Sequence, residues 1–282
     1  MFLFYKINEL YKEKANIFFH LHNDILDSAR PKWLCKYISE YAQKIIVVSE
    51  YIKKRFESIS HNHKTEVLYN CVDLEVFSDY KTEKNKIREK YNIKRDDVVF
   101  IYTGRIMEEK GVLELVKAFN KLEEEYENIK LIIVGNFGKK KNIYIKNIEK
   151  NIITQKIIVT GFVAPNDIPM YLKDSDIVVI PSKWEEPFGV VALEAMAMRK
   201  AIIATKSGGL IEPLNYECSI IIEKKQDLVE NLYCAMKDLY NNKKKREKIS
   251  NNAYDTIMKN RNFNQNNYYD NLAKIIDNKQ VW

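Results

Sequence analysis

The sequence predicts an α/β protein with parallel sheets covered by helices. Short apolar runs rich in Ile and Val alternate with amphipathic stretches of helical length, and this alternation is typical of parallel strands joined by helices. The 282 residues suffice for one large domain or two modest ones with buried cores. A hydrophobic content of 46% is ordinary for a globular protein, which argues against wholesale disorder.

Three short runs near the N-terminus are expected to form one sheet. The expected strands cover residues 17–21, 44–48 and 66–69. Ser49 follows the second strand and is expected to cap a helix over 50–56, because a serine hydroxyl accepts from unpaired amide groups of a first turn. Residues 1–5 are interpreted as the end of a helix, because charged residues follow too soon for a signal peptide. Residues 78–96 are polar and are expected to form a linker with a short helix.

A second, larger sheet is expected in the rest of the chain. Its strands cover 98–103, 130–134, 156–160, 176–180, 201–204 and 219–222. Helices are expected between them, notably over 111–127 and 189–198, and three amphipathic helices follow over 225–240, 243–260 and 264–277. No run approaches the roughly 20 apolar residues that a membrane span requires.

Charge and cysteine usage limit the classes of partner. The net charge of +7 is modest, and the densest basic clusters lie at 139–141 and 243–246. Solvated loops or helix ends are favoured for both clusters over a nucleic-acid or membrane surface. The four cysteines form no C-x-x-C pair and no metal-ligand spacing, which favours a reducing compartment and a cytoplasmic location.

The run 181–197 joins the end of an apolar strand to a helix and places Glu186 and Glu194 eight positions apart. The amide groups and the dipole at a helix N-terminus suit an anion such as a diphosphate. Glu186 precedes this helix end, and Glu194 lies about one and a half turns into the helix at roughly 1.5 Å per residue. Both carboxylates are thus placed to accept from hydroxyls at the two ends of a nucleotide sugar. On these residues alone, an exposed loop acid and an ordinary helix acid remain equally open.

Several segments together resemble the family 4 (group 1) retaining glycosyltransferases. The run 181–197 resembles the E-x7-E motif of that family, and it continues into 200–205 and 208–212. Matching segments at 102–112, 161–163 and 170–172 fall in the family's order, the middle one at its base-binding loop. The resemblance runs from about Phe18 to the C-terminus. It implies the GT-B fold, with two Rossmann-like parallel-sheet domains.

The resemblance also implies three parts of the chain. These are a partial N-terminal, acceptor-side domain (1–80), a C-terminal nucleotide-sugar-binding domain (81–262) and a helix that crosses back to the first domain (263–282). Cys71 replaces the glycine of the family's N-G-V-D link, so left-handed backbone is not expected there. By this resemblance, the first domain is expected to lack the family's first strands. A fragment, a split gene product and a trimmed protein whose sheet a partner chain completes remain open.

Two cations follow the strand 98–103. Arg105 and Lys110 reach the carboxyl edge of the sheet, where ligands of doubly wound folds bind. Cations there neutralise a diphosphate and stabilise it as a leaving group; the resemblance implies this role for both, and two exposed loop cations are the alternative. The resemblance implies that Glu186 contacts hydroxyls of the transferred sugar and that Glu194 contacts the ribose. It also implies that sugar or phosphate oxygens accept from the amide groups of Gly189, Val190 and Val191, and that the backbone of Val163 borders the base. Gly208 and Gly209 are expected to form a tight turn.

A histidine pair ends the first expected strand. Strand alternation sends His20 and His22 to the same side. The family has a histidine at such a strand end, facing the donor sugar, and His22 matches it because it lies closer to the tip. A loop histidine that caps the next segment is the alternative. Asp24 and Asp27 are weaker candidates for a contact with the donor sugar.

Two patterns resemble metal sites and are interpreted as structural. Asp174-Ser175-Asp176 matches a D-x-D motif, but it precedes its strand, at the edge opposite the ligand, and is expected to end a helix and start a strand. His61-Asn62-His63 has no carboxylate or cysteine cluster beside it and is expected to be solvated. With two cations for the diphosphate, neither a metal nor a cofactor is expected. No Gly-x-Gly-x-x-Gly or Walker loop follows any expected strand, which argues against dinucleotides.

The resemblance implies transfer of a hexose from a nucleotide diphosphate sugar to a glycan or lipid-linked acceptor, in the synthesis of cell-surface polysaccharide or lipopolysaccharide. The alternative is a remnant that binds the nucleotide sugar but does not catalyse transfer alone; a GT-B epimerase or phosphorylase fits the donor-side motifs less well. No nucleic-acid partner is expected. Peripheral contact with the inner face of a membrane remains open.

Overall fold

The computed structural model describes residues 17–22, 32–60, 64–77, 85–136, 143–224 and 227–277. The chain divides into two compact units, Met1–Asn70 with Asn266–Trp282, and Cys71–Gln265. The sequence places the corresponding boundaries at 80/81 and 262/263. The predictions for 1–5, Asp24, Asp27, 61–63 and 139–141 concern positions outside the described residues.

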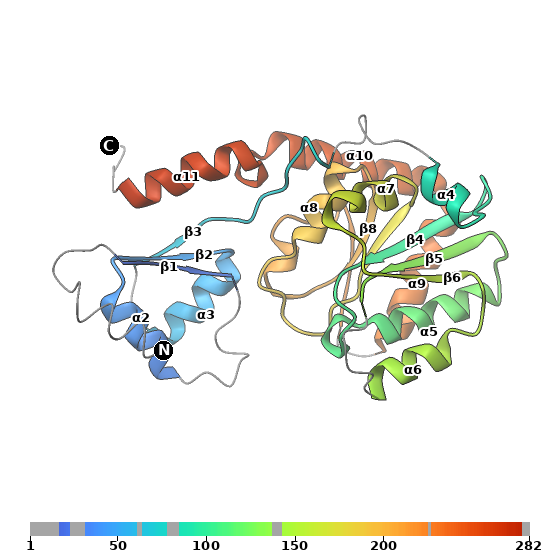
Figure 1. The fold of residues 1–282 in the computed structure, drawn as a ribbon, viewed down its shortest axis with the longest axis horizontal. Helices are drawn as coiled ribbons and strands as arrows, with labels where there is room; N and C mark the ends of the chain where they lie inside the picture. The colour runs from blue at the N-terminus through green and yellow to red at the C-terminus, as the bar shows by residue number, and fades with distance from the viewer. Residues whose placement is uncertain are drawn as a thin grey trace. The chain divides into compact units, whose positions relative to one another are not determined.

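The first unit contains a small parallel sheet (Figure 1). Its strands are β1 (Phe18–Leu21), β2 (Lys44–Val47) and β3 (Thr65–Val67), in that order, and its helices are α2 (Lys32–Tyr41), α3 (Glu50–Ser60) and α11 (Gln265–Asp277). Ile275 of α11 packs with Ile46 and Leu68, so the end of the chain belongs to this unit. Ser49 Oγ accepts from the Ile52 amide at 3.1 Å, which confirms the predicted cap.

The second unit is built on a six-stranded parallel sheet. Its strands are β4 (Val98–Thr103), β5 (Ile129–Val134), β6 (Ile157–Gly161), β7 (Ile177–Ile180), β8 (Ala201–Thr205) and β9 (Ile220–Ile222). The order β6-β5-β4-β7-β8-β9 means that the chain moves outward from β4 in one direction and then from β7 in the other. Each predicted strand is confirmed within one or two residues. The β4–β7 junction is the topological switch point at which such sheets bind ligands, at the carboxyl ends of the strands.

Helices cover both faces of this sheet (Figure 1). They are α4 (Lys86–Lys90), α5 (Val112–Glu123), α6 (Ile143–Asn151), α7 (Ile168–Lys173), α8 (Val190–Ala197), α9 (Leu228–Asn241) and α10 (Lys243–Lys259). Helices α5, α6 and α9 share one face with the fully buried Phe100 and Phe119, whose rings meet edge to face at 6.3 Å. Helices α8 and α10 pack together on the opposite face.

The link that enters the second unit is short and extended. Val72 pairs with Asn264 in an isolated parallel bridge, and the Val72 amide donates to the Phe263 carbonyl at 3.0 Å. Among the described residues, only Asn85, Asn92 and Arg199 have a positive φ without being glycine. Cys71 therefore does not adopt the left-handed geometry that a glycine in this link would permit.

Candidate functional site

Two loops meet at the carboxyl ends of β4 and β7. The first includes the short helix η1 (Glu108–Lys110) and leads into α5, and the second, 181–189, leads into α8. The Lys183 amide donates to the Glu109 carbonyl at 2.8 Å, which ties the second loop to the first. Gly111 has φ +70°, and a Cβ there would lie 2.0 Å from the Pro181 carbonyl oxygen. Only glycine permits this approach, which places the two loops in direct contact.

The close approach at Gly111 predicts how a substitution there changes the free energy of unfolding. We expect Gly111→Ala to lower the free energy of unfolding by about 2–4 kcal/mol, because the added methyl group meets main-chain oxygen and the residue is left-handed. Gly161→Ala is the matched control, since Gly161 has φ +74° with nothing within 4 Å of an added Cβ. We expect it to cost only about 1 kcal/mol. Urea unfolding measures both, and equal losses would contradict the close approach.

An ion pair joins the two loops. Lys110 Nζ lies 2.7 Å from Glu186 Oε1, with the two side chains 17% and 9% exposed. Ser182 Oγ donates to the same Oε1 atom. Lys110 Nζ also lies 5.0 Å from the centroid of the Trp184 ring, within the range of a cation–π contact. The structure therefore brings together the lysine and the first glutamate of the sequence motif, 76 positions apart in the chain.

Buried hydroxyl groups hold the loop that carries Glu186. The Glu186 amide donates to Ser207 Oγ at 3.2 Å, and the Gly209 amide donates to the Glu186 carbonyl at 2.8 Å. Thr205 Oγ1 donates to the Ser182 carbonyl at 2.7 Å. A turn is predicted from the sequence at Gly208 and Gly209, whereas Ser182, Thr205 and Ser207 are not among the predicted site residues. Thr205 ends β8 at the same carboxyl edge, and this position at the end of a strand is the sequence feature from which it could have been predicted.

The helix α8 begins beside Glu186 with no side-chain cap. Gly189 at its N-cap position has φ +112°, and a Cβ there would lie 2.5 Å from Leu210 Cδ1. The amide groups of Val190 and Val191 open the helix and carry the positive end of its dipole. Glu194 lies one turn further, and burial, which disfavours the charged form, raises the pKa of its carboxyl group to about 7. The amide groups of Val190 and Val191 thus lie between Glu186 and Glu194 along the chain.

The remaining predicted residues lie on other loops. Arg105 is exposed after β4, and its carbonyl accepts from the Tyr102 hydroxyl at 2.6 Å, which holds the backbone and leaves the guanidinium at the surface. Val163 is half-buried in the loop after β6, next to Phe162, which is 74% exposed. Both loops leave the same carboxyl edge of the sheet as the Lys110–Glu186 pair.

His22 belongs to the first unit and is described within it. It is exposed directly after β1, and its ring centroid lies 4.1 Å from that of His20. Burial and the neighbouring His22 lower the pKa of His20 to about 4, so His20 is neutral near pH 7. The two rings are tilted by 41° and lie side by side, as the strand alternation predicts for this pair.

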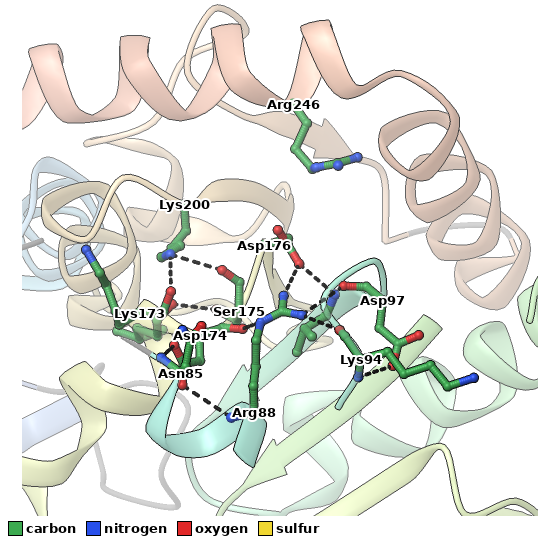
Figure 2. Close-up of polar contacts among 12 residues, drawn as sticks. Asn85, Arg88, Lys94, Asp97, Lys173, Asp174, Ser175, Asp176, Lys200 and Arg246 are labelled. Carbon is green, nitrogen blue, oxygen red and sulfur yellow. Dashed lines mark hydrogen bonds and ion pairs between the residues drawn. The ribbon is translucent and has the colours of Figure 1, made fainter. Parts of the chain in front are cut away.

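The opposite, amino edge of the larger sheet is a structural network (Figure 2). Asp174 accepts from the amide groups of Asn85, Ile87 and Arg88, and Asp176 accepts from Arg88 Nη2 at 3.0 Å and the Val99 amide at 2.8 Å. Asp174 follows α7 and Asp176 precedes β7, which confirms that this D-x-D ends a helix and starts a strand. A polar cavity of about 910 Å³ lies here, and the carboxylates of Asp174 and Asp176 that line it are bonded by the protein's own amide and guanidinium groups.

No group of three or more His, Cys, Asp or Glu within the described ranges is arranged to hold a metal ion. Across the same residues, no helix is long and apolar enough to cross a bilayer.

The parallel sheets and the switch point have the GT-B fold of the structural neighbours. The chain belongs to the family described as glycosyl transferases group 1, whose model matches residues 83–256. The E-x7-E segment and the Arg105–Gly111 segment both lie inside this match.

The chain is similar to two curated glycosyltransferases. The chain is 32% identical over 205 residues to lipopolysaccharide 1,2-N-acetylglucosaminetransferase of Salmonella typhimurium, covering 70% of this chain and 51% of that protein. It is 28% identical over 188 residues to the capsular polysaccharide biosynthesis glycosyltransferase CapM of Staphylococcus aureus, covering 65% and 49%. The chain therefore spans about half the length of these relatives.

Solved structures support the fold. Anabaena HepE in complex with UDP and glucose has a TM-score of 0.82 at 20% identity, covering 96% of this chain and 73% of that one. WaaG, a glycosyltransferase involved in lipopolysaccharide biosynthesis, has a TM-score of 0.76 at 16% identity, covering 98% and 81%. The C-terminal domain of LpcC from Francisella tularensis has a TM-score of 0.57 at 29% identity, covering 66% of this chain and 96% of that domain.

Proposed function

We propose that this chain is a retaining glycosyltransferase that moves a hexose from a nucleotide diphosphate sugar to a glycan or lipid-linked acceptor. The observation that carries the proposal is the Lys110–Glu186 pair beside the uncapped start of α8, with Glu194 one turn further along that helix. The names of the relatives, a lipopolysaccharide transferase and a capsular polysaccharide transferase, support an acceptor in cell-surface polysaccharide synthesis.

The proposed binding mode follows the order of groups along the site. The diphosphate lies against the amide groups of Val190 and Val191 and beside the cations Arg105 and Lys110, which offset its charge. Glu186 accepts from hydroxyls of the sugar, and Glu194 accepts from the ribose. The backbone of Val163 borders the base.

The proposed chemistry needs charge stabilisation more than a side-chain base. The bond between the anomeric carbon and the diphosphate oxygen breaks, and its electron pair leaves with the diphosphate. The acceptor hydroxyl attacks the same face and passes its proton to the departing phosphate oxygen, so the configuration is retained. Arg105 and Lys110 stabilise the negative charge that develops on the leaving group. We propose that this step needs no divalent metal.

The first test is binding by the whole chain. Titration calorimetry with UDP-glucose, UDP-N-acetylglucosamine, GDP-mannose and ADP-glucose, and with the matching nucleoside diphosphates, identifies the donor. UDP-sugars are tested first, because HepE was solved with UDP and with UDP-glucose. Binding of no member of this panel would contradict the proposal.

Arg105 gives a more specific test. We expect Arg105→Ala to weaken nucleoside diphosphate binding about tenfold or more, because a charge-assisted hydrogen bond to phosphate is lost. Arg95→Ala is the matched control, since Arg95 is equally exposed but lies at the amino edge of the sheet. Equal affinities in the two variants would remove Arg105 from the site.

A second candidate is a protein that binds the nucleotide sugar without catalysing transfer alone. This candidate is favoured by one observation: the chain spans about half the length of its relatives. Nucleotide binding without transfer or donor hydrolysis, in the presence of lipid-linked and glycan acceptors, would identify it.

All four cysteines are free, which supports a reducing compartment such as the cytoplasm as the place of action for either candidate.

A further inference from the structure

The two carboxylate oxygens of Glu186 have different surroundings. Oε1 accepts from Lys110 Nζ at 2.7 Å and from Ser182 Oγ. Oε2 accepts from no donor within the described part of the chain, although the residue is only 7% exposed. A carboxylate with one oxygen already bonded by protein donors has a fixed plane, and its second oxygen is left to accept from a ligand.

Ser182 is held more rigidly than Lys110. It is 1% exposed, its carbonyl accepts from Thr205 Oγ1 at 2.7 Å, and its hydroxyl contacts Glu186. Lys110 reaches Oε1 through a flexible four-carbon chain, and its ammonium group carries three donors. A diphosphate in the site attracts this ammonium group, because it carries more negative charge than a single carboxylate. Ser182 is then the donor that still orients Glu186.

We propose that Ser182 is a positioning residue for sugar recognition: its hydroxyl holds Oε1 of Glu186 so that Oε2 faces a hydroxyl of the transferred sugar. This inference rests on the proposed function. It separates two parts of donor binding, because Ser182 acts on the sugar through Glu186 and has no part in holding the diphosphate. The affinity for the nucleotide sugar therefore depends on Ser182, and the affinity for the nucleoside diphosphate does not.

The experiment compares two dissociation constants in each variant. UDP-glucose and UDP are the first probes, followed by the other donor and diphosphate pairs of the panel. We expect Ser182→Ala to weaken nucleotide-sugar binding about tenfold, as for a lost hydrogen bond to a charged group, and to change diphosphate binding less than about twofold. Ser175→Ala is the matched control: its buried hydroxyl donates to the Leu172 carbonyl at 2.8 Å, at the opposite edge of the sheet.

A double-mutant cycle tests whether Ser182 acts through Glu186. In the Glu186→Ala background, we expect Ser182→Ala to cause no further loss of nucleotide-sugar affinity. Ser182→Thr keeps the hydroxyl, and partial recovery relative to Ser182→Ala supports the hydrogen bond over the volume of the side chain.

The outcomes separate this inference from the proposed function. Absence of nucleotide-sugar binding by the unmodified protein would overturn the proposed function and the role of Ser182 with it. Binding by the unmodified protein with an unchanged ratio of the two affinities in Ser182→Ala would overturn the role of Ser182 alone. An equal loss of both affinities, or a full additional loss in the Glu186→Ala background, would assign Ser182 a purely structural role in the loop.

Discussion

Replacing Glu186 with alanine is expected to lower the rate of sugar transfer by about 10²–10³-fold, while nucleoside diphosphate still binds. Glu186 is proposed to accept from hydroxyls of the sugar, so its loss removes contacts that orient the reacting carbon. The proposed diphosphate contacts come from Arg105, Lys110 and the start of α8, which the substitution leaves in place. Lys110 loses its carboxylate partner and becomes fully available to the phosphates. Steady-state transfer rates and calorimetry with UDP measure the two effects.

Glu185 provides the matched control for this experiment. It precedes Glu186 in the same loop and pairs with Lys224 at 2.6 Å, with 40% of its side chain exposed. Glu185→Ala is expected to change transfer less than about threefold, because Glu185 is partly exposed and no contact with the sugar is proposed for it. Transfer at an unchanged rate in Glu186→Ala would contradict the site, and loss of UDP binding in that variant would indicate damage to the loop.

The second large effect is the pH dependence that Glu194 imposes. Burial raises the pKa of Glu194 to about 7, and its carboxylate form is the one proposed to accept from the ribose. Below pH 7 the group is mostly protonated in the free protein, so binding must release a proton. Nucleotide affinity is therefore expected to rise up to about tenfold per pH unit toward pH 7 and to level off above it. Calorimetry in buffers of different ionisation enthalpy measures the released proton.

Unfolding of the free protein tests the same group without a ligand. The folded protein binds the Glu194 proton more tightly than the unfolded chain, so this group's contribution to stability falls as the pH rises from about 4.5 to 7. The fall amounts to about 3 kcal/mol. Glu194→Gln is expected to remove that part of the pH dependence, whereas Glu247→Gln, on an exposed side chain of α10, is expected to leave it. Identical pH profiles in the two variants would contradict a buried, neutral Glu194.

Much of the fold could be predicted from local patterns. The central strands β4, β5 and β7 of the larger sheet are recognisable because each is a short, mostly buried apolar run between polar segments. Helix ends were harder to place: the pattern predicts a helix over 111–127, whereas α5 ends at Glu123. The helical pattern continues through these polar residues, and the turn at 124–125 that leads back to β5 ends the helix.

The two loops, the start of α8 and the spacing of Glu186 and Glu194 can be predicted from the sequence, because each depends on residues close together in the chain. The contact of both Lys110 and Ser182 with one oxygen of Glu186 is seen only in the folded protein. That meeting depends on β4 pairing with β7, two strands separated by β5 and β6 in the chain. Strand order is decided by packing of the whole sheet, and the close approach at Gly111 then brings the loops together. Neither the strand order nor this close approach can be predicted from the local periodicity of the sequence.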